Sequence, residues 1–468
     1  MATHWLRDSF LGQTHEAATR VDWYSAEDEE NPHNWSQSKK AFVLGVIGAY
    51  SFVVYMAAAI YTPSEGAFAE EFDIGDAEAS LELSLYVLGY GAGPMFFSPL
   101  SEIPRIGRNL PYVVSFVLYC GISIPTALFP SAISFYFLRF LQGFFGSPCL
   151  ATGGASIADI YSTDVLPHAM ATWVLCVFCA PPIGVLVAGF AIPVLGWRFS
   201  MWEILIAAAP ILVLLLLLPE TSSATILHRR ARRLERRDRS GKYQTKADAI
   251  QGDTSFSVVV RESLLIPSKI TLLDPAILFL NCYTSLTYGI FYSFIEAFPI
   301  VYQDLYRFNL GEMGLGFLAI VVGSIISFAI YNVYYMHHRK HQHQDHQIST
   351  PSPSPNPEKV LLPALYACAG PPLALVLFGW ASRPSIHWTI PTLGIAIYPA
   401  CVFILMQCVF LYVPACYPHY AASVCAATDF TRSAFACGAV MFSRPLYVDL
   451  GVGVGCSILA GLTVVCAA

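Results

Sequence analysis

Twelve apolar stretches, each close to the length that crosses a lipid bilayer, fill most of the 468 residues. A transmembrane helix needs about 20 predominantly apolar residues. Within one lipid-exposed segment, only a helix satisfies every backbone donor and acceptor. The sequence therefore predicts an all-α membrane protein with twelve transmembrane helices. The predicted spans are 41–61, 81–100, 110–130, 133–155, 168–192, 201–219, 275–300, 314–336, 361–381, 386–411, 421–443 and 451–468.

The composition supports a lipid-embedded chain and argues against a soluble enzyme. Charged residues make up 12% of the sequence, whereas soluble domains average about 25%. No cluster of His, Asp and Glu that predicts a metal site lies at membrane depth, and no nucleophile lies there with a matching base. We therefore expect no enzyme activity, no cofactor and no metal. The net charge of −6 gives no indication of a nucleic-acid partner.

The distribution of Lys and Arg sets the expected orientation. Twenty of the 26 basic residues lie before residue 41, in the loop between spans 2 and 3, at 220–274 or at 337–360. Loops rich in basic residues remain in the cytosol. We therefore expect a multi-pass plasma-membrane protein with both termini in the cytosol, surrounded by lipid.

The spans divide into two groups of six. We expect a cytosolic segment at 1–40, a six-helix half at 41–219, a basic cytosolic linker at 220–274 and a second six-helix half at 275–468. Two such halves are typical of transporters that alternate around a central site. The arginine-rich linker could lie on anionic lipid or remain a solvated connection.

Two segments of the second half have unusual compositions. Residues 337–360 are rich in His, then in Ser and Pro, and are predicted to form a disordered cytosolic loop in which metal binding is an alternative without a defined site. The last span, 451–468, has no polar residues after it. Its 18 residues reach about 27 Å as a helix, slightly less than a hydrocarbon core of about 30 Å. We therefore expect a weakly anchored last helix.

Several separated motifs resemble the major facilitator superfamily, in the branch of fungal drug:proton antiporters that includes the benomyl and fluconazole resistance pumps. The motifs are GPMFFSPLSEIPRIGR at 93–108, LRFLQG at 138–143, NPHNW at 31–35, LPETS at 218–222, NLGEMG at 309–314 and RPSIHW at 383–388. The resemblance covers about residues 31–466. It implies a major facilitator fold and a transport function.

The motif between spans 2 and 3 implies a conformational latch. Gly107 would supply a tight turn, and Arg105 and Arg108 could pair with Glu102 or with Asp159 at the end of span 4. Such pairs would hold one transport state and break on opening. The alternative is that the arginines only anchor the loop on the cytosolic side.

An arginine inside span 4 is the strongest single indication of a functional site. Arg139 would lie about 10 Å into the bilayer, where a charge needs a polar cavity or a partner. Gln142 lies one helical turn further along the same face. Arg139 could snorkel to the outer headgroups, or it could tune a nearby carboxylate in a proton cycle.

Span 5 contains APPIGVLVAG at 180–189, which resembles the antiporter motif of the same family. The Pro181–Pro182 pair predicts a disrupted helix. Gly184 and Gly189 would allow close packing against the other half. Ala180 and the residue after Gly184 depart from the family pattern, which leaves both antiport and facilitated export open.

Span 7 places four polar side chains on one helix face. Asn281, Tyr288, Tyr292 and Glu296 follow one another at helical spacings. Tyrosines on a cavity wall suit flat, weakly polar organic ligands. Asn281, Tyr288 and Tyr292, with Gln142 of span 4, are therefore candidates for the substrate cavity. Glu296 is either a proton-coupling group or an interfacial carboxylate.

Span 11 contains an internal pair of opposite charges. Asp429 and Arg432 lie three residues apart on one helix face. The pair could be structural, or it could belong to the gate or the proton path.

These features together predict a monomeric secondary active transporter. It would export hydrophobic or amphipathic small organics, such as antifungal drugs or fungal secondary metabolites, in exchange for protons. A polyamine or nutrient permease, or a membrane sensor that binds ligand without moving it, remains the alternative.

Overall fold

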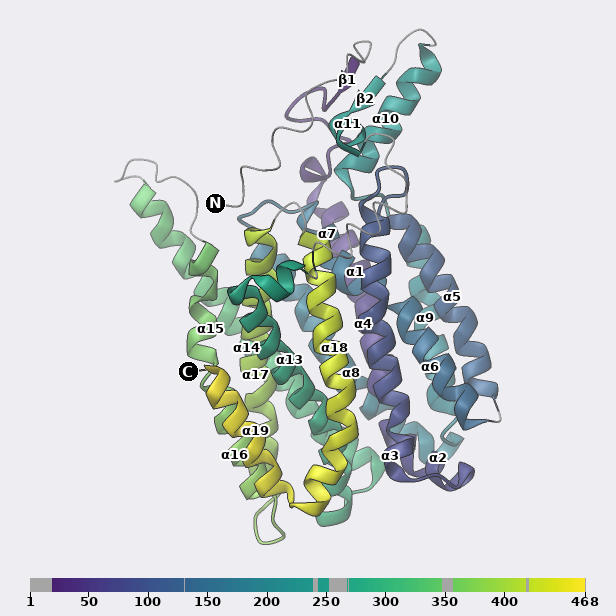
Figure 1. Ribbon diagram of the computed structural model, residues 1–468, viewed down its shortest axis with the longest axis vertical. Helices are drawn as coiled ribbons and strands as arrows, with labels where there is room; N and C mark the ends of the chain where they lie inside the picture. The colour runs from purple at the N-terminus through teal and green to yellow at the C-terminus, as the bar shows by residue number, and fades with distance from the viewer. Residues whose placement is uncertain are drawn as a thin grey trace.

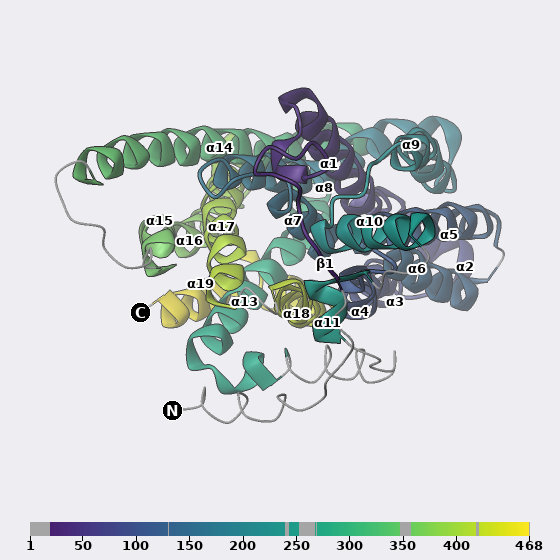
Figure 2. The same ribbon diagram turned by 90° about the horizontal axis from the view of Figure 1, so that it is seen from above.

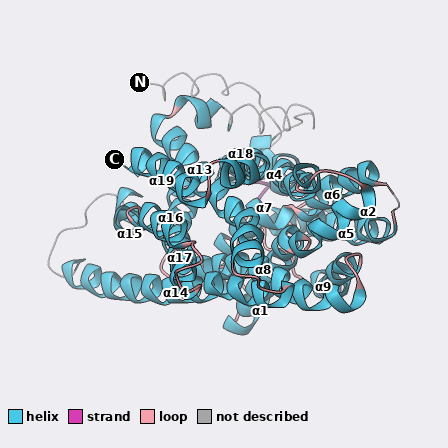
Figure 3. Cartoon of the chain, turned by 90° about the horizontal axis from the view of Figure 1, so that it is seen from below, coloured by secondary structure: helices cyan, strands magenta, loops and turns pink. Residues whose placement is uncertain are grey.

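The computed structural model describes residues 19–129, 131–238, 243–251, 267, 269–346, 357–417 and 421–467. These residues form a helical bundle, as the colouring by secondary structure shows (Figure 3). Helices from the first part of the chain lie on one side of the bundle, and those from the second part lie beside them (Figure 1). This side-by-side arrangement persists in the view from above (Figure 2).

The first six predicted spans each coincide with a helix. They are α1 (Gln37–Ala59), α4 (Leu81–Glu102), α5 (Asn109–Leu128), α6 (Ala132–Gly146) with α7 (Pro148–Ala158), α8 (Leu166–Leu195) and α9 (Phe199–Leu216). Ser36 caps α1 by accepting a hydrogen bond from the Lys39 backbone N–H. The fourth span is divided at Ser147, because Pro148 has no backbone N–H to continue the α6 hydrogen-bond pattern.

The last six predicted spans also coincide with helices. They are α13 (Pro275–Phe298) with the π-helical turn η3 (Pro299–Leu305), α14 (Leu310–His346), α15 (Leu362–Ala367) with α16 (Gly370–Ala381), α17 (Thr389–Cys416), α18 (Ala421–Asp449) and α19 (Val452–Ala467). A reciprocal capping box begins α14, since Asn309 and Glu312 each accept the other's backbone N–H. The NLGEMG motif therefore has a local structural role.

The outer surface of the bundle fits a lipid environment. Seven helical stretches among the described residues are long and apolar enough to cross a membrane. Large apolar side chains point outward, such as Ile133, Val194 and Leu217, which are 80%, 81% and 65% exposed. A soluble monomer rarely exposes apolar surface on this scale. The chain is therefore a multi-pass membrane protein.

The two ends of the bundle differ. One end, called here the linker end, carries α10 (Ser223–Arg237), α11 (Lys246–Gln251) and two strands (Figure 1). Strand β1 (Thr19–Val21) pairs in parallel with β2 (Tyr243–Thr245). The opposite end, called the α2 end, carries α2 (Glu65–Phe72) and α3 (Asp76–Ala79).

Helix α10 is held by the segment that precedes α1. The Arg230 guanidinium makes ion pairs of 2.7 Å with Asp28 and 2.9 Å with Glu30, and it stacks on Tyr24. Its hydrogen bonds hold the pKa of Asp28 well below its usual range. Part of the linker is thus docked on the protein. That part is neither a solvated connection nor available to lipid.

The prediction of a disordered loop over 337–360 is wrong for its first ten residues. Helix α14 continues to His346 and extends beyond the bundle (Figure 2). The physical reason is local, because residues 337–346 contain no Pro or Gly and the residue types present are compatible with a helix. Residues 347–356 of the predicted loop, and the His side chains from 338 onward, lie outside the described residues. The last four residues of the predicted loop belong to the 3-10 helix η4 (Pro357–Leu361), so the prediction of disorder is wrong there too.

The crossing of α4 and α6 yields a stability prediction. A Cβ at Gly143 would overlap the Tyr86 carbonyl oxygen, and a Cβ at Gly89 would overlap the Phe140 carbonyl oxygen. Gly143→Ala should therefore destabilise the protein by about 3 kcal/mol, since two backbones would have to separate. The measurement is the thermal unfolding midpoint of the purified protein in one detergent.

Gly121→Ala is the matched control. Gly121 lies inside α5, and apart from its chain neighbours and the backbone of α5 itself no atom lies within 4 Å of the position that a Cβ would occupy there. An alanine there should stabilise the helix by up to about 1 kcal/mol. Equal midpoints for the two variants would contradict the close approach of α4 and α6.

Candidate functional site

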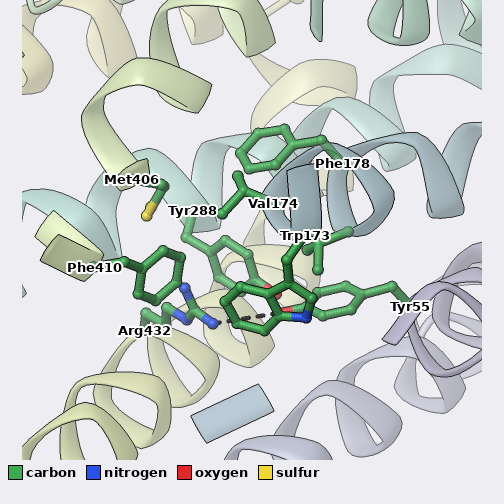
Figure 4. A pocket seen from close by; sticks show the side chains of 9 residues that line it. Tyr55, Trp173, Val174, Phe178, Tyr288, Met406, Phe410 and Arg432 are labelled. Carbon is green, nitrogen blue, oxygen red and sulfur yellow. Dashed lines mark hydrogen bonds between the residues drawn. The ribbon is translucent and has the colours of Figure 1, made fainter. Parts of the chain in front are cut away.

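A small closed cavity lies where helices of the two halves meet. Its volume is about 20 Å³, enough for roughly one water molecule. Helices α1, α8, α13, α17 and α18 contribute the side chains that line it (Figure 4). The lining residues are Tyr55, Trp173, Val174, Val177, Phe178, Tyr288, Met406, Phe410 and Arg432. The wall is therefore aromatic and aliphatic, with one cation.

Arg432 supplies that cation. Its guanidinium pairs with Asp429 at 2.9 Å, one turn earlier on α18, and both side chains are buried. It stacks on the ring of Tyr288 at 4.8 Å and donates a hydrogen bond of 3.3 Å to the Tyr55 hydroxyl (Figure 4). The sequence-predicted pair thus forms, and the structure places its arginine against the central cavity.

A layer of tyrosine hydroxyls joins the two halves beside the cavity. The Tyr90 hydroxyl of α4 hydrogen-bonds to the hydroxyls of Tyr288 and, at 2.9 Å, of Tyr292 on α13. Tyr288 lines the cavity and Tyr292 adjoins it through this layer. Tyr90 was not predicted from the sequence, because it lies inside span 2 within an apolar run.

The other two predicted cavity residues lie away from this space. Asn281 is buried on α13, closer to the linker end. Gln142 is buried on α6, where it donates a hydrogen bond of 2.7 Å to Ser123 of α5 and accepts one of 2.7 Å from Arg139. In this closed structure neither side chain lines the cavity.

Arg139 has a buried carboxylate partner that the sequence did not reveal. It forms an ion pair with Glu82 of α4, and neither side chain is exposed. Arg139 also donates a hydrogen bond of 2.8 Å to the Ala57 carbonyl and stacks on Tyr86 at 4.3 Å. Since the guanidinium points into the protein, the snorkelling alternative is wrong.

Glu82 was not predicted from the sequence because it is the second residue of a predicted span. At that position a carboxylate resembles an ordinary helix-end residue. The signal that could have identified it is an acid inside one span facing an arginine inside another, since an intramembrane charge needs a partner.

The cavity is closed on both sides by contacts between the halves. Towards the α2 end, Ser80 donates a hydrogen bond of 3.0 Å to the Glu296 carboxylate. Towards the linker end, Gln407 of α17 donates one of 3.0 Å to the Pro167 carbonyl of α8. His168 and Asn332 form a second hydrogen bond between the halves at that end. The structure is therefore occluded.

One of the predicted ion pairs joins the loop between α4 and α5 to the end of α7. Arg108 of that loop meets Asp159, the residue after α7, at 2.6 Å. Gly107 has a φ of +80°, and a Cβ there would overlap the Glu220 carboxylate. Glu220 itself accepts a hydrogen bond of 3.0 Å from the Arg108 backbone N–H, so this loop is also fixed by a residue that the latch hypothesis did not include.

The remaining latch candidates make no ion pair in the part of the chain that the structure describes. Glu102 ends α4, is half-buried, and lies near enough to Arg108 and Asp159 to interact electrostatically with both. Arg105 is exposed and lines the pocket beside α10. Of the two arginines, Arg108 therefore makes the contact with Asp159 in this structure.

The predicted disruption of span 5 is not observed, because α8 continues through Pro181 and Pro182 as one helix. Neighbouring helices can satisfy the backbone groups that proline leaves free in a membrane helix. Gly184 packs on Met56 of the same half. At Gly189 a Cβ would lie 2.6 Å from the Leu310 carbonyl oxygen of the other half. The two glycines thus allow close helix approach on both sides of α8.

Comparisons with known proteins agree with this geometry. The sequence profile of the Major Facilitator Superfamily matches residues 47–440. The MFS-type transporter pyvG of Aspergillus violaceofuscus is 44% identical over 97% of this chain and 82% of its own length. Fluconazole resistance protein 1 of Saccharomyces cerevisiae is 36% identical over 92% of this chain and 77% of its own length.

Solved structures show a similar fold at low sequence identity. The xylose transporter XylE of E. coli, in a partially occluded inward-open conformation, has a TM-score of 0.63 and 13% identity, over 92% of this chain and 97% of its own. The human organic anion transporter MFSD10 has a TM-score of 0.60 and 15% identity, over 92% and 98%.

Proposed function

This chain belongs to the major facilitator superfamily, and we propose that it exports hydrophobic or amphipathic small organic molecules in exchange for protons. Membership places it among transporters rather than enzymes. The cavity between the halves carries the proposal, because its rings and methionine suit flat, weakly polar ligands. Relatives named for resistance to fluconazole and cycloheximide support drugs or fungal metabolites as the substrates.

The proposed orientation places the linker end in the cytosol of a plasma-membrane monomer. The basic helix α10 supports this assignment, because basic segments remain on the cytosolic side. The occluded structure would then open outward by separation of Ser80 from Glu296, and inward by separation of Gln407 from the Pro167 carbonyl.

Two buried ion pairs are the candidates for proton coupling. Glu82 with Arg139 and Asp429 with Arg432 each place a carboxylate beside a guanidinium inside the bundle. A proton that binds the carboxylate removes the attraction and frees the arginine. The charge of Arg139 would thereby tune the Glu82 carboxylate during the cycle. The Arg108–Asp159 contact would act as the latch at the linker end.

The charge of the cavity argues against the polyamine alternative. Polyamines are cations, whereas Arg432 presents a positive charge to the cavity and Asp429 is already paired with it. Neutral or weakly anionic substrates fit this wall better.

A transport assay tests the proposal. Expression in a drug-sensitive yeast that lacks its own pumps should lower accumulation of a fluorescent hydrophobic substrate severalfold, and a protonophore should abolish the effect. Tyr288→Ala should lose most of the activity, because it removes the ring that lines the cavity and contacts Arg432.

Phe279→Ala is the control on the same helix, since Phe279 is exposed on the outer surface of α13. It should transport like the native chain. If accumulation falls equally with and without the proton gradient, proton coupling is wrong; if Tyr288→Ala transports normally, the assignment of the cavity is wrong.

A further inference from the structure

A second, much larger pocket lies outside the membrane-spanning region, between α10 and the linker end of the first half. Its volume is about 690 Å³, which falls within the range of about 300–1,000 Å³ for small-molecule sites. Six cationic side chains line it, against three carboxylates. The cations are Lys39, Arg105, Arg229, Arg232, Arg233 and Arg236.

The positive charge in this pocket is only partly compensated. Arg233 pairs with Glu30 at 2.8 Å, and Arg232 pairs with Glu235 of the same helix at 3.3 Å. Arg229 lies 3.7 Å from Glu220, beyond hydrogen-bond distance. Among the residues that the structure describes, Lys39, Arg105 and Arg236 have no ion pair with a carboxylate. Cationic groups are therefore in excess in one concave space.

The helix that carries four of these arginines presents them along one face. Arg229, Arg232, Arg233 and Arg236 are spaced by three, one and three residues, which brings them to the same side of α10. Arg230 points to another side, where Asp28 and Glu30 bury it. The run of arginines thus contains two structural groups, one that faces the pocket and one, Arg230, that is buried against Asp28 and Glu30. Glu30 also pairs with Arg233, at the edge of the pocket.

Three contacts hold the pocket in shape without filling it. Arg230 fixes α10 to the segment before α1. His228 pairs with Asp248 at 2.8 Å and fixes α10 to α11. The Glu220 carboxylate accepts backbone hydrogen bonds from the loop that also carries Arg105. Because its walls are held in this way, the site is pre-organised for a ligand.

We propose that this pocket binds an anion that carries several phosphate groups. Guanidinium groups bind phosphate oxygens in a bidentate geometry, and four of them on one wall favour more than one phosphate. The ligand is either the headgroup of a phosphoinositide in the inner leaflet or a soluble polyphosphorylated molecule. Such a ligand ties α10 to Arg105 and to the start of α1, and so stabilises the first half at its linker end.

The test uses the full-length protein in phosphatidylcholine nanodiscs. In one arm, soluble inositol trisphosphate is titrated and the thermal unfolding midpoint is followed by tryptophan fluorescence. In the other arm, the fraction of phosphatidylinositol bisphosphate in the nanodiscs is raised in steps and no soluble phosphate is added. A saturable rise in the midpoint in either arm supports the site, and the arm that responds identifies the source of the phosphates. The response should weaken as salt is added.

Two double variants separate a site from general attraction. Arg232→Gln/Arg236→Gln removes two lining charges and should weaken the apparent affinity about tenfold. Arg237→Gln/Lys246→Gln also removes two positive charges, but from exposed linker positions outside the pocket. This second variant should change the apparent affinity less than about twofold. The proposal is overturned if neither arm raises the midpoint, or if the two double variants weaken binding equally.

Discussion

Arg139→Gln should abolish proton-driven transport and destabilise the protein, whereas Glu82→Gln/Arg139→Gln should recover most of the stability and none of the transport. Removal of one partner of a buried ion pair leaves an uncompensated charge and costs about 3–5 kcal/mol. Both side chains are fully buried here, so water cannot take the place of the missing partner. Two neutral amides of similar size remove that cost but cannot exchange a proton.

The measurement is a double-mutant cycle over native, Glu82→Gln, Arg139→Gln and the double variant. Thermal unfolding reports stability, and uptake into vesicles with an imposed pH gradient reports transport. Arg198→Gln with Glu71→Gln forms the control cycle, because that pair meets at 2.7 Å near the α2 end with both side chains partly exposed. The interaction free energy between Arg198 and Glu71 in that cycle should not exceed about 1 kcal/mol.

Two outcomes would contradict the assignment. Transport by Arg139→Gln at the native rate would show that the buried charge has no role in the cycle. A double variant no more stable than either single variant would show that the two side chains do not compensate each other.

The helices were predictable because an apolar run is a local property of the chain. Spans such as 168–192 and 386–411 contain enough apolar residues to require a helix in lipid, whatever surrounds them. The extension of α14 to His346 was missed because the prediction relied on apolar runs. Polar residues outside the membrane form no such run, even when they are helical.

Within one helix, spacing alone predicted the pair of Asp429 with Arg432. Partners on different helices were predictable only where a motif brought them together. The motif after α4 offered Glu102 or Asp159 as a partner for its arginines, and the structure shows the contact of Arg108 with Asp159. No motif associated Arg139 with Glu82, or Arg230 with Asp28. These contacts depend on how α6 crosses α4 and how the first segment folds over α10, which are tertiary features. Likewise, Glu220 binds backbone N–H groups, and such groups are identical at almost every position of a sequence.

The charge of the central cavity gives the second large effect. Arg432→Gln should lower transport of neutral and anionic substrates at least about tenfold, because it removes the cation of the cavity wall and its contacts with Tyr288 and Tyr55. The change also leaves Asp429 without its partner. The variant should therefore gain affinity for cationic compounds, which can pair with that carboxylate. Substrate competition in vesicles measures both changes.

Asp429→Asn/Arg432→Gln separates a substrate contact from a structural pair. If Arg432 served only to neutralise Asp429, the double variant would transport normally, since no buried charge would remain unpaired. If Arg432 contacts substrate, the double variant should stay inactive towards neutral and anionic substrates and should also lose the gain for cations, because the carboxylate is gone. Arg383→Gln is the control, since Arg383 lies in the loop before α17 and outside the central cavity. Normal transport by the double variant would therefore show that Arg432 is only a structural residue. An inactive double variant, together with normal transport by Arg383→Gln, would place Arg432 in the substrate path.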